Sequence, residues 1–283
     1  MPKKGKGINI LNDNYEWIER KNKERDECYK KIDESAKQTK YSSKLFKQYL
    51  DIQTRFDKYS VGNALLISLQ MPNATNFRTK DDWKKINITV NQNAKSFKIL
   101  EPSNPIQSAN GKKATYYNPK DMYDITQTNA KASDKAVLYS DEKLLKALIH
   151  ICPAKVKAVD KLENNLCAKF DAEQNILYVC RGMDTDKLFQ VFTAELSKLI
   201  QDKNNMENKL GNFGNYCVSY MICKKYGKSV ESFNFENIPP QIQQMYVKDF
   251  RAELTTMKYM LNKITKQIDD VISYKVPNKA NVR

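Results

Sequence analysis

Residues 59–67 read Tyr-Ser-Val-Gly-Asn-Ala-Leu-Leu-Ile and hold an apolar run in the charged first half of this 283-residue chain. Ser60 is a typical helix N-cap, because its hydroxyl can accept a hydrogen bond from a free N–H of the first turn. Pro72 disfavours helical geometry in the residue before it. The segment therefore predicts a helix that starts at Ser60, carries the apolar run and continues through Gln70.

On the C-terminal side of this helix the pattern changes. Thr79 followed by two aspartates and Trp83 indicates a short helix, because acidic residues in a first turn suit the helix dipole. Alternation and turn residues then predict strands, which are residues 96–100, 114–117 and 122–126, with a turn-rich stretch from 104 to 113. We expect the first half to combine helices with a small antiparallel sheet.

On the N-terminal side, residues 14–50 read as helical and highly charged. Residues 1–12 are small, basic and glycine-containing, which predicts a disordered tail. The polar stretch 128–133 is the expected linker. These features predict two domains, covering residues 13–130 and 131–283.

The second half is predicted to be mostly helical. Two short runs around residues 171–175 predict a β-hairpin over 166–179. The expected helices begin at Asp141, at Asp184, at Tyr216 and after the prolines at 239 and 240, the last reaching Tyr274. The whole chain is therefore expected to be of the α+β class.

The chain carries a formal charge of +15, from 48 Lys and Arg against 33 Asp and Glu. Residues 1–135 hold 26 of the basic and 16 of the acidic residues, so two thirds of the excess lies in the first half. Such a balance favours polyanions, because neutralised phosphates release counterions. A lysine-rich solvated surface would give the same composition, and charge alone does not choose between the two.

His150 is the only histidine, which excludes a metal site that needs two. The six cysteines show no Cys-x-x-Cys spacing, so we expect reduced, mostly buried thiols. A nucleophile pair of His150 and Cys152 is disfavoured, because side chains two residues apart on a helix do not face each other. Phosphate-binding glycine loops are missing. Without an export signal or a membrane-length apolar run, a cytoplasmic protein is expected, with no membrane partner.

Five motifs, in order, resemble one known family. They read Tyr-Ser-Val-Gly-Asn-Ala-Leu-Leu-Ile at 59–67, Gln-Met-Pro-Asn-Ala-Thr at 70–75, Trp-Lys-Lys at 83–85, Phe-Lys-Ile-Leu-Glu-Pro at 97–102 and Tyr-Asp-Ile-Thr-Gln-Thr at 123–128. Residues 15–128 are similar to the N-terminal single-stranded-DNA-binding domain of ArdC-type antirestriction proteins. Plasmids, conjugative elements and phages carry such proteins, so the resemblance implies a mobile-element protein in a bacterial host cell.

The resemblance also implies a second domain similar to a zinc metallopeptidase, in which a hairpin leads into a helix bearing His-Glu-x-x-His. Here residues 192–199 read Phe-Thr-Ala-Glu-Leu-Ser-Lys-Leu. Ala194 and Lys198 stand at the two histidine positions, and only Glu195 remains. The helix that would supply an acidic third ligand corresponds to 215–220, which has no carboxylate.

These replacements remove the zinc chemistry that the family pattern implies. A catalytic zinc needs three protein ligands and an open position. Alanine has no donor atom, and lysine is a cation at neutral pH. We expect Glu195 to be a remnant paired with Lys198, and the domain to be a pseudoenzyme with no metal, no cofactor and no catalytic residue.

Residues 55–98 contain eight Lys and Arg against three acidic residues. Single-strand binders combine a basic track with aromatic faces on which bases stack. The candidate nucleic-acid-binding residues are Tyr59, Asn63, Arg78, Lys80, Trp83, Lys84, Lys85, Lys95 and Lys98. Trp83 and Tyr59 could instead be core residues, the lysines could be merely solvated, and Asn63 could serve as a buried cap or hydrogen-bonding group.

The function expected from these observations is non-catalytic DNA binding. It should favour single strands, with double-stranded DNA as a further partner, and should be led by backbone contacts. The resemblance implies protection of incoming DNA against host restriction. Two alternatives stay open: an inhibitor that binds a host defence nuclease complex through its protein surface, and a divergent peptidase.

Overall fold

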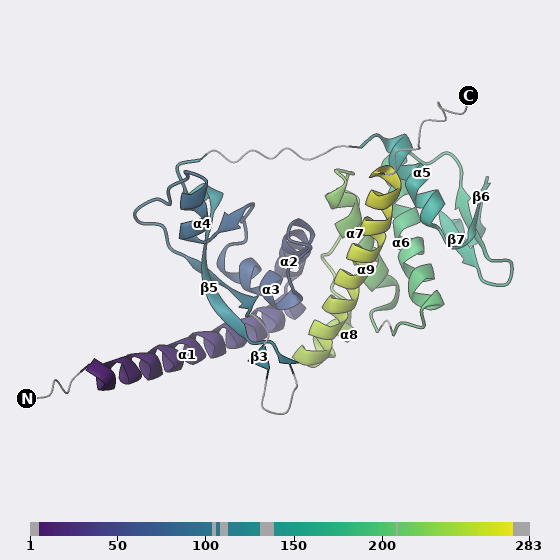
Figure 1. The fold of residues 1–283 in the computed structure, drawn as a ribbon. Coiled ribbons are helices and arrows are strands. Elements are labelled where there is room, and N and C mark those ends of the chain that lie inside the picture. The colour runs from purple at the N-terminus through teal and green to yellow at the C-terminus, as the bar shows by residue number, and fades with distance from the viewer. Residues whose placement is uncertain (1–5, 104–105, 108–112, 131–138, 208, 274–283) are drawn as a thin grey trace, which may run out of the picture. The chain divides into compact units, whose positions relative to one another are not determined.

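The computed structural model describes residues 6–103, 106–107, 113–130, 139–207 and 209–273. The chain divides into two compact units. Unit 1 comprises residues 1–39 and 62–134, and unit 2 comprises 40–61 and 135–283. Both units mix helices with a small sheet (Figure 1), which confirms the α+β class.

Unit 1 contains an antiparallel sheet with the strand order β1-β5-β2. Its elements are α1 (Lys6–Tyr41), whose last residues enter unit 2, α3 (Val61–Gln70), β1 (Phe77–Arg78), α4 (Lys80–Lys85), β2 (Phe97–Pro102), β3 (Ile106–Gln107), β4 (Lys113–Ala114), β5 (Tyr117–Asp124) and the 3₁₀ turn η1 (Ile125–Gln127). The helices predicted at 60–70 and after Thr79 are confirmed. The Thr79 hydroxyl accepts the Asp82 N–H at 3.1 Å and caps α4.

The strands predicted at 114–117 and 122–126 are placed differently. Residues 117–124 form one strand, β5, and residues 125–127 form η1. Asp124 ends the strand, because its buried carboxylate accepts the N–H groups of Thr75, Asn76 and Thr126. The side chain of Gln127 completes a capping box by accepting the Asp124 N–H at 2.9 Å.

Unit 2 packs helices against a mixed sheet with the order β6-β8-β7. Its elements are α2 (Ser43–Arg55), α5 (Asp141–Ile151), β6 (Lys155–Val159), the 3₁₀ turn η2 (Glu163–Asn165), β7 (Ala168–Asp171), β8 (Ile176–Cys180), α6 (Thr185–Lys203), α7 (Gly211–Lys225), α8 (Pro240–Gln244) and α9 (Val247–Ser273). The predicted hairpin is β7–β8 and is confirmed. Strand β6, which the sequence reading missed, adds to β8 in parallel.

Ion pairs and aromatic packing hold helix α2, and the turn after it, against the other helices of unit 2. Asp51 accepts the Tyr220 hydroxyl at 2.5 Å and pairs with Lys224, and Asp57 pairs with Lys225 at 2.5 Å. The Phe46 ring packs against the rings of three phenylalanines at 213, 235 and 250. Packing thus groups residues 40–61 with the second unit, whereas the sequence reading placed them in a domain over 13–130.

Two expected segments fall partly outside the described residues. Of the tail expected over 1–12, residues 1–5 are outside, and residues 6–12 begin helix α1. Of the linker expected over 128–133, residues 131–133 are outside. Among the described residues, none of the helices has the length and apolar character needed to cross a membrane.

Candidate nucleic-acid interface and the metallopeptidase-like helices

Trp83 anchors a small substructure of unit 1, here called the α4 lobe and defined as residues 77–95 and 123–130. The indole is 1% exposed, and its N–H donates to the Tyr123 carbonyl at 2.8 Å. Val90 and Ile125 complete the buried cluster. The ring of Trp83 therefore lies in the core of the lobe rather than on its surface.

Four predicted cations stand exposed on the α4 lobe: Arg78, Lys80, Lys84 and Lys95. Within the described part of the chain, none of the four forms an ion pair with an acidic side chain. The Arg78 guanidinium lies 5.5 Å from the centre of the Trp83 ring. The surface of the lobe thus presents four basic side chains that pair with no described carboxylate.

Lys85 differs from its neighbours, because its ammonium pairs with Asp82 at 2.7 Å. The hydrogen bond between them raises the pKa of Lys85 and lowers that of Asp82. Both side chains are exposed, so such a pair contributes little to stability. A phosphate would have to compete with Asp82 for this lysine.

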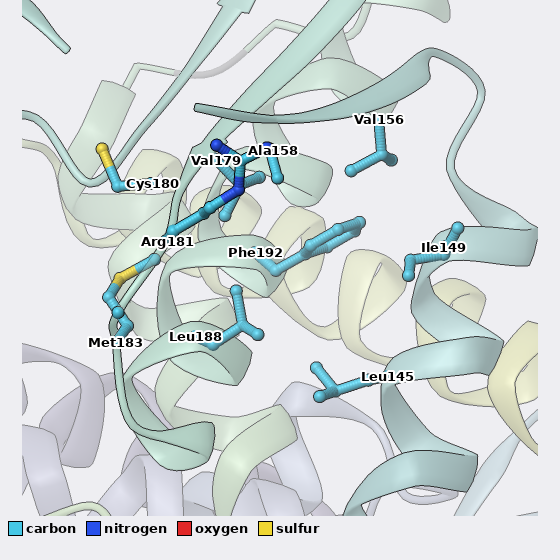
Figure 2. A pocket seen from close by; sticks show the side chains of 11 residues that line it. Leu145, Ile149, Val156, Ala158, Val179, Cys180, Arg181, Met183, Leu188 and Phe192 are labelled. Atoms are coloured by element: carbon cyan, nitrogen blue, oxygen red, sulfur yellow. The ribbon is translucent and has the colours of Figure 1, made fainter. Parts of the chain in front are cut away.

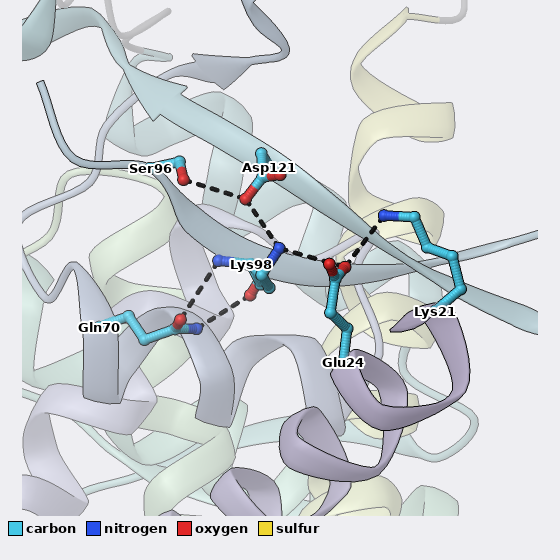
Figure 3. A network of polar contacts seen from close by, with 6 residues as sticks. All are labelled: Lys21, Glu24, Gln70, Ser96, Lys98 and Asp121. Atoms are coloured by element: carbon cyan, nitrogen blue, oxygen red, sulfur yellow. Dashed lines mark hydrogen bonds and ion pairs between the residues drawn. The ribbon is translucent and has the colours of Figure 1, made fainter. Parts of the chain in front are cut away.

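Lys98 belongs to a network that joins α1 to the sheet (Figure 3). Its ammonium lies 3.0 Å from Oδ1 of Asp121 and 3.4 Å from Oε2 of Glu24, and Glu24 also pairs with Lys21 at 2.9 Å. Burial opposes the charge of Lys98, but the hydrogen bond to Asp121 and the attraction of both carboxylates raise its pKa overall. Two carboxylates therefore neutralise this lysine within the fold.

Asn63 is bound to the edge of the sheet. Its side-chain N–H donates to the Leu100 carbonyl and its Oδ1 accepts the Leu100 N–H, both at 2.8 Å. Gln70, two turns along α3, donates to the Lys98 carbonyl at 2.9 Å and accepts the Lys98 N–H at 3.2 Å. We call Asn63 and Gln70 the amide clamp, because together they bond the N–H and C=O groups of Lys98 and Leu100 on the outer side of β2.

Tyr59 lies in unit 2, at the turn that follows α2. Its half-buried ring packs edge-on against the Phe56 ring, with the two ring centres 6.2 Å apart. Its carbonyl accepts a hydrogen bond from Gln53 at 3.3 Å. Tyr59 is therefore grouped with α2, whereas the lobe cations belong to unit 1.

Helix α6 carries the residues that align with the metallopeptidase motif. Ala194 and Glu195 are half-buried, and Lys198 is exposed. Burial raises the pKa of Glu195, and the charge of Lys198 only partly opposes this. The expected ion pair between Glu195 and Lys198 is wrong for this structure, because among the described residues the Lys198 ammonium lies more than 4.0 Å from the Glu195 carboxylate oxygens.

Two side chains of α6, Thr193 and Ser197, form hydrogen bonds to side chains of α7, and each lies one residue before an aligned position. The hydroxyls of Thr193 and Ser219 lie 2.9 Å apart, and Ser197 donates to Oδ1 of Asn215 at 3.0 Å. All four residues are buried. Their matched four-residue spacing on two helices was the signal that the sequence reading missed.

These groups do not fit a catalytic zinc. The polar groups between α6 and α7 are neutral hydroxyls and an amide that are already hydrogen-bonded to one another, whereas zinc prefers imidazole, thiolate and carboxylate ligands. In the described ranges, three or more His, Cys, Asp or Glu side chains nowhere converge as a metal site would require. His150 is exposed near the end of α5, and the six cysteines are free thiols.

Comparison with known proteins adds evidence at the level of the fold. No family model matches the chain, and no curated protein matches it. The metal-free crystal structure of the antirestriction protein ArdC from plasmid R388 is similar with a TM-score of 0.54 and 11% identity, over 76% of this chain and 85% of that one. The Mn(II)-bound structure of that protein gives 0.52 and 9% over the same shares. The resemblance read from the sequence motifs is thus confirmed in three dimensions, and the chain has the fold of the ArdC antirestriction protein.

Proposed function

We propose that this chain is a non-catalytic nucleic-acid-binding protein that prefers single strands and acts in antirestriction. The antirestriction role rests on the fold shared with ArdC of plasmid R388. The binding role rests on unit 1, whose motifs resemble a single-stranded-DNA-binding domain. The α4 lobe is the surface through which we propose that binding occurs.

The observation that supports the proposal most directly is the set of basic side chains on the α4 lobe that pair with no acidic residue in the described part of the chain. Residues 77–95 contain five basic residues and two aspartates, and one of these, Asp82, is held by Thr79 and Lys85. Arg78, Lys80, Lys84 and Lys95 therefore keep their charge available for phosphates. The proposed interface contains fewer residues than the nine candidates. Trp83, Asn63 and Lys98 are left out because their side chains are bonded within the fold, and Tyr59 because it belongs to unit 2.

Binding through such cations is led by the phosphate backbone and carries little sequence information. Each phosphate that is neutralised releases counterions, so affinity falls as salt rises. We expect affinity for single-stranded DNA to fall at least about tenfold between about 50 and 200 mM salt. A flat response would exclude the electrostatic mechanism.

The direct test reverses charges on the lobe. The double variant Lys80→Glu/Lys84→Glu should bind fluorescent oligothymidylate of about 20 nucleotides at least about tenfold more weakly, measured by anisotropy. Its salt slope should fall by about 1.4, the value for two lost single-strand phosphate contacts. The matched control is Lys248→Glu/Lys266→Glu, which makes the same charge change on exposed positions of α9 in unit 2.

The control separates a local interface from general charge attraction. Under the proposal, the α9 variant keeps most of its affinity while the lobe variant loses it. Equal losses in both variants would contradict the lobe as the binding surface. Circular dichroism of each variant checks that the fold is intact.

The proposal of a non-catalytic unit 2 rests on α6 and α7. The R388 protein binds Mn(II) in its crystal structure, whereas the facing side chains here are the Thr193–Ser219 and Ser197–Asn215 pairs. We expect elemental analysis of the purified protein to find far less than one equivalent of zinc or manganese. About one equivalent, or peptide cleavage abolished by a chelator, would contradict the proposal.

A further inference from the structure

Strand β6 forms an open edge of the sheet in unit 2. It pairs with β8 alone, in parallel. Lys155 donates to the Asn175 carbonyl at 3.1 Å and Arg181 donates to the Val159 carbonyl at 2.8 Å, so residues 155 and 159 face β8. Alternate residues of a parallel strand direct both backbone groups to the same side. The N–H and C=O groups of Val156 and Ala158 therefore point outward, and within the described chain they have no backbone partner.

An apolar cavity of about 320 Å³ lies beside this edge (Figure 2). Its walls come from α5, β6, β8 and the first turns of α6, and they include Leu145, Ile149, Val156, Ala158, Leu188 and Phe192. Val156 and Ala158 thus present outward backbone groups while their side chains line the cavity. An extended segment that pairs with β6 would place every second side chain into this cavity.

The opposite face of β6 is basic. Lys155 and Lys157 are exposed, and neither forms an ion pair with a described acidic residue. The Lys157 ammonium lies 5.9 Å from the centre of the Tyr178 ring. Opposite charges placed across neighbouring strands attract, whereas like charges repel. The strand therefore favours an acidic neighbour on this face.

We propose that β6 and its cavity bind an extended segment of a partner protein whose residues alternate between apolar and acidic. The segment adds to the sheet as a strand beside β6. Its apolar residues enter the cavity, and its acidic residues face Lys155 and Lys157. A second copy of β6 is a poor occupant, because it would bring lysines opposite lysines, a device that keeps edge strands from self-pairing.

The probe is a fluorescent peptide of about eight residues in which valine and glutamate alternate. We expect saturable binding to the full chain, measured by anisotropy. A peptide with lysine in place of glutamate should bind at least about tenfold more weakly. The same loss is expected for a peptide N-methylated on the amides that face the protein, because it lacks the donors for strand pairing.

Two protein variants test the two faces of β6. Ile149→Glu puts a charge at the cavity wall on a residue that is 53% exposed, so the fold should tolerate it. Lys157→Glu reverses the charge on the opposite face. Each should weaken the valine–glutamate peptide at least about tenfold, whereas Lys266→Glu on α9 should not.

The proposal is overturned if the valine–glutamate peptide shows no saturable binding. It is also overturned if N-methylation leaves the affinity unchanged, because then strand pairing takes no part, or if Ile149→Glu leaves it unchanged, because then the cavity takes no part. DNA binding by Ile149→Glu should equal that of the unmodified protein. The outcome on β6 is therefore independent of the outcome on the α4 lobe.

Discussion

The two three-stranded sheets differ in how the outward backbone groups of one edge strand are bonded. In unit 1, the outward backbone groups of edge strand β2 are bonded by the side-chain amides of Asn63 and Gln70. In unit 2, the corresponding groups of edge strand β6, at Val156 and Ala158, have no described backbone partner. One edge is closed by a helix of its own unit, and the other is available to an additional strand.

The difference shows what closes a sheet edge. Helix α3 carries two amides seven residues apart, on one face and two turns distant. Each primary amide carries N–H donors and a carbonyl acceptor, so one side chain can bond both the C=O and the N–H of a strand residue as a neighbouring strand would. Helix α5 lies beside β6 but contributes Leu145 and Ile149, which form a cavity wall and cannot bond the backbone.

The largest expected loss of stability comes from removing the Asn63 amide, which bonds the edge of β2. Asn63→Ala removes two hydrogen bonds and leaves the buried N–H and C=O of Leu100 without partners. We expect a loss of about 3 kcal/mol in the free energy of unfolding, measured by urea denaturation. The matched control is Asn118→Ala, an exposed asparagine of β5 that should change stability by less than about 0.5 kcal/mol.

If Asn63→Ala and Asn118→Ala cost the same, the amide clamp does not stabilise the edge. The measured m-value should stay constant, because the change affects the native state and not the surface exposed on unfolding. A constant m-value lets the two midpoints be compared directly.

Gln70 should contribute less to stability than Asn63, because its partner Lys98 is only half-buried and water can replace a lost hydrogen bond. Gln70→Ala is expected to cost about 1 kcal/mol. The double variant with Asn63→Ala should cost less than the sum of the two, because either opening loosens the same strand. Strict additivity would mean that the two amides act on independent sites.

The sequence predicted the elements better than their partners. Ser60 and Pro72 bracket α3, and Thr79 caps α4, because caps and prolines act over a few residues. Asn63 was open between a ligand contact and a hydrogen-bonding role. Its partner Leu100 lies 37 residues away, and no local pattern reveals a contact at that separation.

The prediction of the candidate site was limited in the same way, by contacts between residues far apart in the sequence. Lys98 looked like a free cation, but Glu24, which neutralises it, lies 74 residues away in α1. Strand β6 does show a signal, because Lys155 to Ala158 alternates between lysine and apolar residues. Its parallel pairing with β8 follows only from the tertiary fold. The exposed lysines of α4 were the part that composition and local pattern could predict.

The ion network at Lys98 should have a smaller and pH-dependent effect. Burial raises the pKa of Glu24 and of Asp121, but charged and hydrogen-bonding partners hold both below their ordinary values of 4.5 and 3.8. The partners are Lys21 and then Lys98 for Glu24, and Lys98 with Ser96 for Asp121. For a lowered acid pKa, the stabilisation is present above the ordinary value and is lost as the pH falls through the folded-state value. Lys98→Met should therefore cost under about 1 kcal/mol at pH 7, and thermal unfolding at low pH should show the difference shrinking. A pH-independent difference would mean that the lysine acts through packing.

The most local effect is expected in the hydrogen exchange of single backbone amides. The Leu100 N–H, bonded to Asn63, should exchange slowly, and Asn63→Ala should accelerate it. The N–H groups of Val156 and Ala158 should exchange rapidly in the unmodified protein, because no described group accepts them. Slow exchange at both in the free protein would show that β6 is already covered. Slowing at Val156 and Ala158 alone on addition of the valine–glutamate peptide would show that an added strand supplies from outside what the amide clamp supplies to β2 from within.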